Sequence, residues 1–146
     1  MPFSLPQFLP YLLNQSAEAV GRQFQTEYKE RYGMLRTEWR VLFHLGLYGD
    51  LTAKQICDHA SLHKTKVSRA VAALEKKRFL TRATDDADRR NENLSLTKAG
   101  LAAFRSLSAS AEAYEAKLTA QLSEDEVRDL KRLLMKVSGF EPKAPK

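Results

Sequence analysis

The sequence predicts a mostly α-helical protein that carries one small β-hairpin, and three observations support this. Apolar residues recur at three- and four-residue steps over most of the 146 residues, which is the spacing of amphipathic helices. Two short segments with β-forming residues, Phe79–Arg82 and Asn93–Leu96, enclose the polar, charged stretch Asp85–Arg90, which is suited to a turn. The net charge is +6, and it is distributed unevenly along the chain.

Four helices are expected before the hairpin. Their positions follow from apolar periodicity and from capping residues. The expected segments are Gln7–Arg31, a helix capped by Thr37 that ends at Tyr48 before Gly49, a helix opened by the capping box Thr52 and Gln55 that ends near Ala60, and Lys64–Lys77.

Two further helices are expected after the hairpin. Thr97 is expected to cap the first, and Ser123 with Glu126 forms a capping box for the second, which ends before Gly139. Two helices with a tight connection, followed by a charged hairpin, form a winged helix-turn-helix. The expected organisation is an N-terminal dimerisation helix (1–34), a winged helix-turn-helix core (35–100), C-terminal dimerisation helices (101–138) and a disordered tail (139–146).

The excess positive charge lies in the middle third of the chain. Between Ser61 and Arg105 there are eleven basic and five acidic residues, which account for the whole net charge. A localised basic surface attracts polyanions such as double-stranded DNA. A solvated basic face is the alternative, and charge alone does not decide between the two.

The expected helix Lys64–Lys77 has two different faces on a helical wheel. Val67, Val71 and Leu74 point one way and mark the core side, while small residues, hydroxyls and cations point the other way. Arg69 can donate two hydrogen bonds to guanine, and the lysines suit phosphates. The residues of this helix expected to contact DNA are Lys64, Thr65, Lys66, Ser68, Arg69 and Lys76.

The stretch from Leu51 to Gly100 resembles the MarR family of bacterial regulators. The matching parts are the segment LTAKQICDHASLHKTKVSRAVAALEKK and the signature Asp88-Arg89-Arg90, Leu96-Thr97 and Gly100. The resemblance implies that Lys64–Lys76 is a recognition helix in the major groove. It also implies that Arg90 enters the minor groove, oriented by a salt bridge from Asp88, with Arg89 in the same DNA-binding wing. Family members commonly carry Gly where this chain has Arg78.

The resemblance implies a sequence-specific, ligand-responsive transcription regulator, more often a repressor. The single cysteine and the lack of a secretory signal favour the cytoplasm. A homodimer on a pseudo-palindromic operator is expected, because the apolar stripes of the terminal helices cannot all be covered within one chain. The alternatives are a closed monomeric bundle and a winged-helix interaction module without DNA binding. No nucleophile–base pairing or phosphate-binding loop indicates an enzyme, and no cofactor, metal or membrane-spanning segment is expected.

An effector site is expected on the second helix. Its apolar coat is interrupted by Arg40 and His44, which could bind the carboxylate of a small aromatic acid beside Trp39 and Phe43. The alternative is that Arg40 and His44 are bonded within the fold. Cys57 is expected to be a small buried thiol rather than a redox sensor.

Overall fold

The computed structural model describes residues 2–85 and 88–144, and for 85 and 88–91 it describes the backbone alone. The prediction of a mostly helical winged helix-turn-helix protein is confirmed. None of the helices in these described ranges is long and apolar enough to cross a membrane. In chain order the elements are η1 (Leu5–Gln7), α1 (Leu9–Tyr32), α2 (Arg36–Tyr48), β1 (Leu51–Thr52), α3 (Ala53–Ala60), α4 (Lys64–Lys76), β2 (Leu80–Asp85), β3 (Asp88–Leu96), α5 (Lys98–Leu118) and α6 (Glu124–Ser138).

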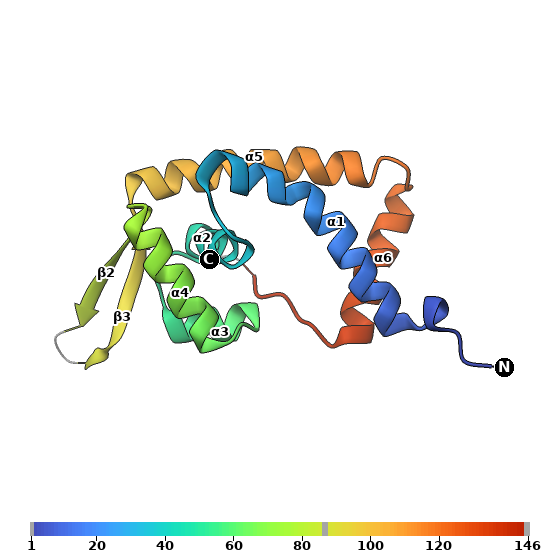
Figure 1. Cartoon of the computed structure of the whole chain (residues 1–146), viewed down its shortest axis with the longest axis horizontal. Coiled ribbons are helices and arrows are strands. Elements are labelled where there is room, and N and C mark those ends of the chain that lie inside the picture. Colours follow the sequence, from blue (N-terminus) through green and yellow to red (C-terminus); the bar gives the residue numbers. More distant parts are fainter. Residues whose placement is uncertain (1, 86–87, 145–146) are drawn as a thin grey trace.

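The elements form two parts joined along α5 (Figure 1). Helices α2, α3 and α4 and the β2–β3 hairpin lie below one end of α5, and α6 turns back from its other end. Helix α1 runs beside α5. The buried core lies in the first part, and α6 has no buried residue. The chain thus has one well-packed body and one open helical arm.

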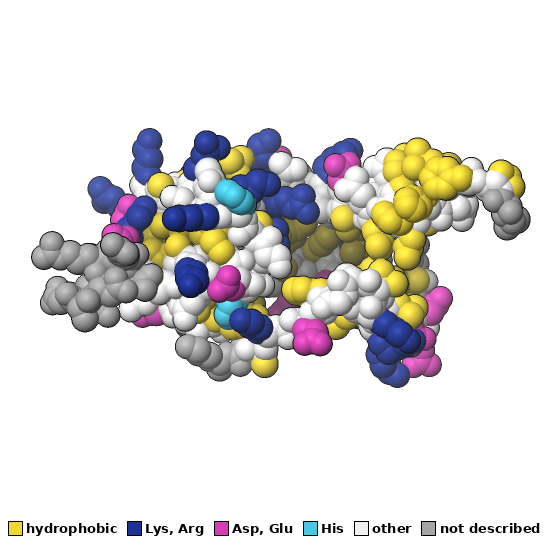
Figure 2. Space-filling view, turned by 90° about the horizontal axis from the view of Figure 1, so that it is seen from below, with side chains coloured by type: hydrophobic (Ala, Val, Ile, Leu, Met, Phe, Trp, Pro, Cys, Tyr) yellow, Lys and Arg dark blue, Asp and Glu magenta, His cyan; other side chains and the backbone are white. Residues whose placement is uncertain are grey.

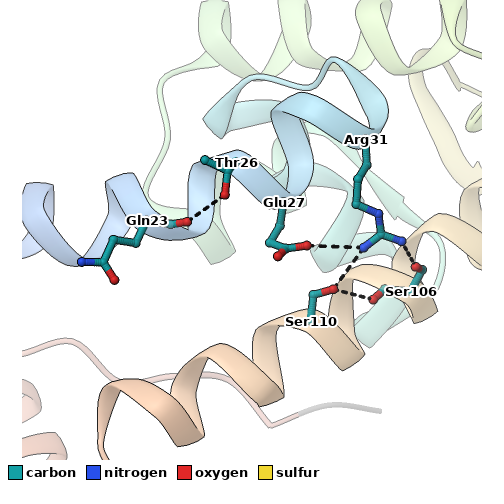
Figure 3. Close-up of polar contacts among 6 residues, drawn as sticks. All are labelled: Gln23, Thr26, Glu27, Arg31, Ser106 and Ser110. Atoms are coloured by element: carbon teal, nitrogen blue, oxygen red, sulfur yellow. Dashed lines mark hydrogen bonds and ion pairs between the residues drawn. The ribbon is translucent and has the colours of Figure 1, made fainter.

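A polar cluster holds the end of α1 against α5 (Figure 3). The Arg31 guanidinium donates to the Ser110 hydroxyl over 3.0 Å and also to the Ser106 hydroxyl, one turn earlier on α5. Glu27, one turn before Arg31, pairs with the same guanidinium at 3.6 Å. Because one planar cation contacts both helices, this cluster fixes where α1 meets α5.

Most of the predicted helix starts are confirmed. Thr52 and Gln55 form their reciprocal capping box, as do Ser123 and Glu126. The exception is α2, which begins at Arg36 rather than after Thr37. The Glu38 carboxylate accepts the backbone N–H of Leu35 over 2.6 Å. This bond satisfies a free donor at the helix start, so α2 begins before Thr37.

The sheet has three strands, in the order β1-β3-β2, where the sequence predicted two. β1 is only two residues long, and so short a strand has no periodicity to detect; it pairs Leu51 with Leu94. The hairpin strands extend further than predicted, because Asp85 belongs to β2 and Asp88–Arg90 belong to β3, and Asp85 pairs with Asp88. Leu80 and Leu94, each 1% exposed, anchor the hairpin in the core.

The apolar faces of α1 and α2 are only partly buried. The apolar coat of α2 does not cover its ends, because Leu35 and Leu47 are 64% and 45% exposed. The apolar stripe of α1 is buried only at Phe24 and Tyr28. Periodicity identifies an apolar face but not its neighbour, and in the described residues most of the apolar stripe of α1 stays exposed, as expected for a terminal helix.

Candidate nucleic-acid interface

Helix α4 is anchored by one buried side. Val67, Val71 and Leu74 are at most 2% exposed, as the helical wheel predicted. The helix begins where His63 Nδ1 accepts the backbone N–H of Thr65 over 3.2 Å, a cap that the sequence analysis missed. A buried seam of this kind leaves the helix little freedom to rotate, so its opposite face has a defined direction.

That opposite face is exposed and basic. In the half of the molecule that carries α3 and α4, lysine and arginine side chains dominate the surface (Figure 2). Within the described ranges, Lys64, Lys66, Arg69 and Lys76 make no ion pair, so their positive charge is available to an external anion. The exposed side chains are Lys64, Thr65, Lys66, Ser68, Arg69, Ala72 and Lys76.

A buried carboxylate fixes the far end of α4. Glu38 of α2 is 4% exposed and lies 3.5 Å from the Lys77 ammonium, just after α4 ends. The same carboxylate accepts the Leu35 N–H at the start of α2. Glu38 therefore ties the start of α2 to the end of α4, and removal of one partner would leave a polar group buried without its bond.

The turn that leaves α4 is left-handed. Arg78 has φ 64°, and the bonds Arg78 N–H to Glu75 O and Phe79 N–H to Leu74 O close a Schellman motif. The chain therefore keeps the conformation that glycine favours although an arginine occupies the position. The Arg78 side chain is exposed.

The junction between this turn and α5 explains part of the signature. The Thr97 hydroxyl accepts the Gly100 N–H, which caps α5, and donates to the Arg78 carbonyl over 2.7 Å. A Cβ on Gly100 would lie 2.0 Å from the Phe79 carbonyl oxygen. Glycine is therefore required where α5 starts against the exit of α4, and the junction places α4 relative to α5.

The tip of the wing is only partly described. The backbone of Asp88, Arg89 and Arg90 belongs to β3. Their side chains, and with them the expected Asp88–Arg90 salt bridge, lie outside the described residues. The base of the wing is described, and there Arg82 pairs with Glu75 of α4 and with Glu92 of β3. Sequence analysis counted Arg82 only as a basic residue.

A cavity of about 630 Å³ lies between α1, α2 and α5. Of the four expected effector residues, Trp39 and Phe43 line it, and Arg40 and His44 do not. Arg40 instead donates to the Ala60 carbonyl over 3.1 Å, and His44 Nδ1 donates to the Arg40 carbonyl. The aromatic lining also includes Phe24, Tyr28 and Tyr114, and the charged lining is Glu18, Arg22, Arg36 and Glu115.

Two groups beside this region have shifted pKa values. Burial raises the pKa of the Tyr28 phenol, and the nearby Trp39 and Arg36 partly oppose this. Burial lowers the pKa of the Arg40 guanidinium, and the positive charge of Arg36 adds to the effect. Arginine stays protonated at any ordinary pH, so Arg40 acts as a fixed cation within the fold.

The remaining candidates carry no clear chemistry. Cys57 is a free thiol that is half-buried, so it is more accessible than the sequence suggested. Among the residues whose positions the structure gives, no group of three or more His, Cys, Asp or Glu side chains could hold a metal ion.

Comparison with known proteins gives consistent matches. The model of the MarR family matches residues 32–91. The chain is 29% identical to YwaE, an uncharacterized HTH-type transcriptional regulator of Bacillus subtilis, over 86% of this chain and 74% of that protein. A MarR/EmrR family transcriptional regulator from Acinetobacter sp. ADP1 is 27% identical and superposes with a TM-score of 0.83, covering 94% of this chain and 96% of that one.

BpsR of Bordetella bronchiseptica has the same fold. It is 20% identical and superposes with a TM-score of 0.86, covering 97% of this chain and all of BpsR, whose DNA binding is regulated by 6-hydroxynicotinic acid. Fold and exposed basic helix together define a winged helix-turn-helix DNA-binding protein. The chain is a transcriptional regulator that binds DNA, and it is similar to the MarR family over residues 32–91 and in its fold.

Proposed function

We propose that the protein is a ligand-responsive repressor that acts as a homodimer on a pseudo-palindromic operator. The observation that carries this proposal is the exposed face of α4, where Arg69 stands among cations that make no ion pair with any described residue. Arg69 then reads a guanine in the major groove, and Lys64, Lys66 and Lys76 contact phosphates. Arg90 and its neighbours in the wing contact the adjacent minor groove.

The open helical arm supports the homodimer. Hydrophobic side chains gather at the end of the molecule opposite the wing (Figure 2). Exposed apolar patches of this extent mark interaction surfaces, and a second copy covers two such patches by symmetry. On and around η1, α1 and α6, the large apolar residues that are at least 39% exposed are Phe3, Leu5, Phe8, Leu9, Leu12, Val20, Leu130, Leu133, Leu134, Met135, Val137 and Phe140.

The cavity between α1, α2 and α5 supports a small aromatic acid as the effector. Its volume of about 630 Å³ falls in the range of small-molecule sites. Trp39 and Phe43 offer aromatic faces, and Arg36 offers a guanidinium for a carboxylate. Glu115, an acid of the lining, is already paired with Lys131 at 3.2 Å. A ligand wedged here changes how α1 and α5 sit against α2, and so displaces the recognition helices of the dimer.

The first test is the salt dependence of binding to the DNA upstream of the protein's own gene. If a dimer neutralises about six phosphates, the slope of log affinity against log salt concentration is close to −5. Fluorescence anisotropy at a series of salt concentrations gives this slope. A slope near zero would contradict the repressor and favour a winged-helix module that contacts only proteins.

Two substitutions on α4 extend the same titration. Arg69→Ala is expected to cost about 1–3 kcal/mol on the operator and to relax the preference at one base pair in each half-site. Lys76→Ala is the matched control, and it should weaken operator and random DNA equally, because a phosphate contact carries no sequence information. Equal losses of selectivity in both variants would show that the face is assigned wrongly.

The effector site is tested through Trp39, the single tryptophan of the chain. A panel of benzoic and nicotinic acids is expected to change its fluorescence saturably and to release operator DNA. Arg36→Met should weaken the best acid about tenfold, because a charge-assisted hydrogen bond is lost. Arg40→Met is the control, since Arg40 bonds to Ala60 outside the cavity. Loss of binding in the control alone would place the acid elsewhere.

A further inference from the structure

Arg82 occupies an unusual position for a basic residue of a DNA-binding wing. It lies on β2, and its guanidinium contacts two acids on different elements. Its Nε is 3.3 Å from Glu75 of α4, and its Nη1 is 3.4 Å from Glu92 of β3. The three side chains are 35%, 46% and 37% exposed. We refer to these three residues as the wing clamp.

The wing clamp lies where apolar packing stops. At its base the hairpin is held by Leu80 and Leu94, which are buried. Beyond that base, a cleft of about 630 Å³ separates α3 and α4 from the sheet, and Arg82 and Glu92 stand on its wall. Within the described ranges, the pair of Arg82 with Glu75 is the ionic contact between α4 and the wing strands. This contact joins the wing strands to α4 beyond the buried base of the hairpin.

The negative charges of Glu75 and Glu92 are unexpected beside a surface that binds DNA. Glu75 stands directly before Lys76, and Glu92 stands on the strand that carries the signature arginines, so both acids border the surface that meets DNA. By charge alone each acid repels phosphates and lowers affinity. Half-exposed ion pairs also add little to folding stability, because water screens them. Neither direct DNA contact nor stability explains two acids at this place.

We propose that Arg82 is a positioning residue, and that Glu75 and Glu92 favour DNA binding by holding it. The clamp sets the angle of the wing before DNA arrives, so that the recognition helix and the wing enter adjacent grooves together. This inference depends on the DNA-binding function proposed above. The proposal predicts that removal of a negative charge beside the DNA surface weakens binding to DNA. Charge repulsion alone predicts the opposite.

Neutral substitutions of the two acids test the proposal. Glu75→Gln and Glu92→Gln are each expected to weaken operator binding about fivefold, the size of a typical coupling between contacting residues. Asp58→Asn is the matched control, because Asp58 is an exposed acid of α3 outside the clamp. Its loss should leave affinity unchanged or raise it. Arg82→Lys should fall between wild type and Arg82→Met, because an ammonium cannot replace both directed contacts.

A distance measurement separates positioning from other causes. Spin labels on Thr84 of the wing and Ala72 of α4, in a Cys57→Ala background, report the spread of wing angles without DNA. The spread should be narrow in the intact clamp and broad in Glu75→Gln, with the thermal midpoint unchanged. Tighter binding by both glutamine variants, or unchanged spread, would overturn the proposal. In that case Arg69→Ala should still weaken operator binding. The proposed repressor function would then stand although the positioning role of the clamp is wrong.

Discussion

Five base pairs inserted between the two half-sites of the operator are expected to lower the affinity of the protein by about two orders of magnitude. Each half-site remains intact, but the insertion turns one of them to the opposite side of the duplex, because one turn of DNA is about 10 base pairs. A rigid dimer cannot then place both copies of α4 in the major groove. Replacement of five spacer base pairs without a change in length is the control, and it should preserve affinity.

The dimer behind this result is tested independently on α6. No residue of this helix is buried in the single chain. Leu133→Glu therefore costs the isolated fold little, but it places a charge in the expected contact with a second copy. Sedimentation should show a monomer, and operator affinity should fall to that of one half-site. A wild-type protein that sediments as a monomer and tolerates the insertion would exclude the dimeric repressor.

Helix α4 and its buried side could be predicted from the sequence because their signals are local. Val67, Val71 and Leu74 recur at helical spacing, so the wheel identified the buried side, and the opposite side followed. Capping boxes such as Thr52 with Gln55 also lie within four residues of one another. The structure confirms both kinds of prediction, because neither requires knowledge of distant neighbours.

The contacts that position α4 could not be predicted, because they join residues on different elements of the fold. Glu38 and Lys77 are 39 positions apart, and neither flanking sequence shows that the carboxylate is buried. The pairing of Arg82 with both Glu75 and Glu92 requires the hairpin register, which the sequence did not define. Long-range polar pairs of this kind are specified by the complete fold rather than by a local pattern.

The charged residue beside Trp39 and Phe43 in the cavity could have been predicted from helix geometry. Arg40 and His44 were expected beside Trp39 and Phe43 because they interrupt the apolar coat, but adjacent residues on a helix point about 100° apart. Arg36 lies three positions before Trp39 and seven before Phe43, so the three share one face. In the structure these three residues line the cavity, and Arg40 faces α3.

A side chain at Gly100, where α4 and α5 meet, is expected to have a large effect on stability. A Cβ on Gly100 would lie 2.0 Å from the Phe79 carbonyl oxygen and 2.9 Å from its carbonyl carbon. These are backbone atoms, and the same oxygen already accepts the Thr97 N–H over 3.0 Å. The backbone can yield only by breaking this bond or by moving the turn at Arg78.

Gly100→Ala is therefore expected to lower the free energy of unfolding by about 3 kcal/mol, at the upper end of overpacking effects. Urea denaturation measures this change. Gly21→Ala is the control, because a Cβ on Gly21 meets no atom within 4 Å. It should raise stability by up to about 1 kcal/mol, since alanine favours a helix over glycine. Molecules that remain folded should bind the operator weakly, since a displaced Phe79 shifts the exit of α4. A variant within about 0.5 kcal/mol of wild type would show that the junction is looser than these distances indicate.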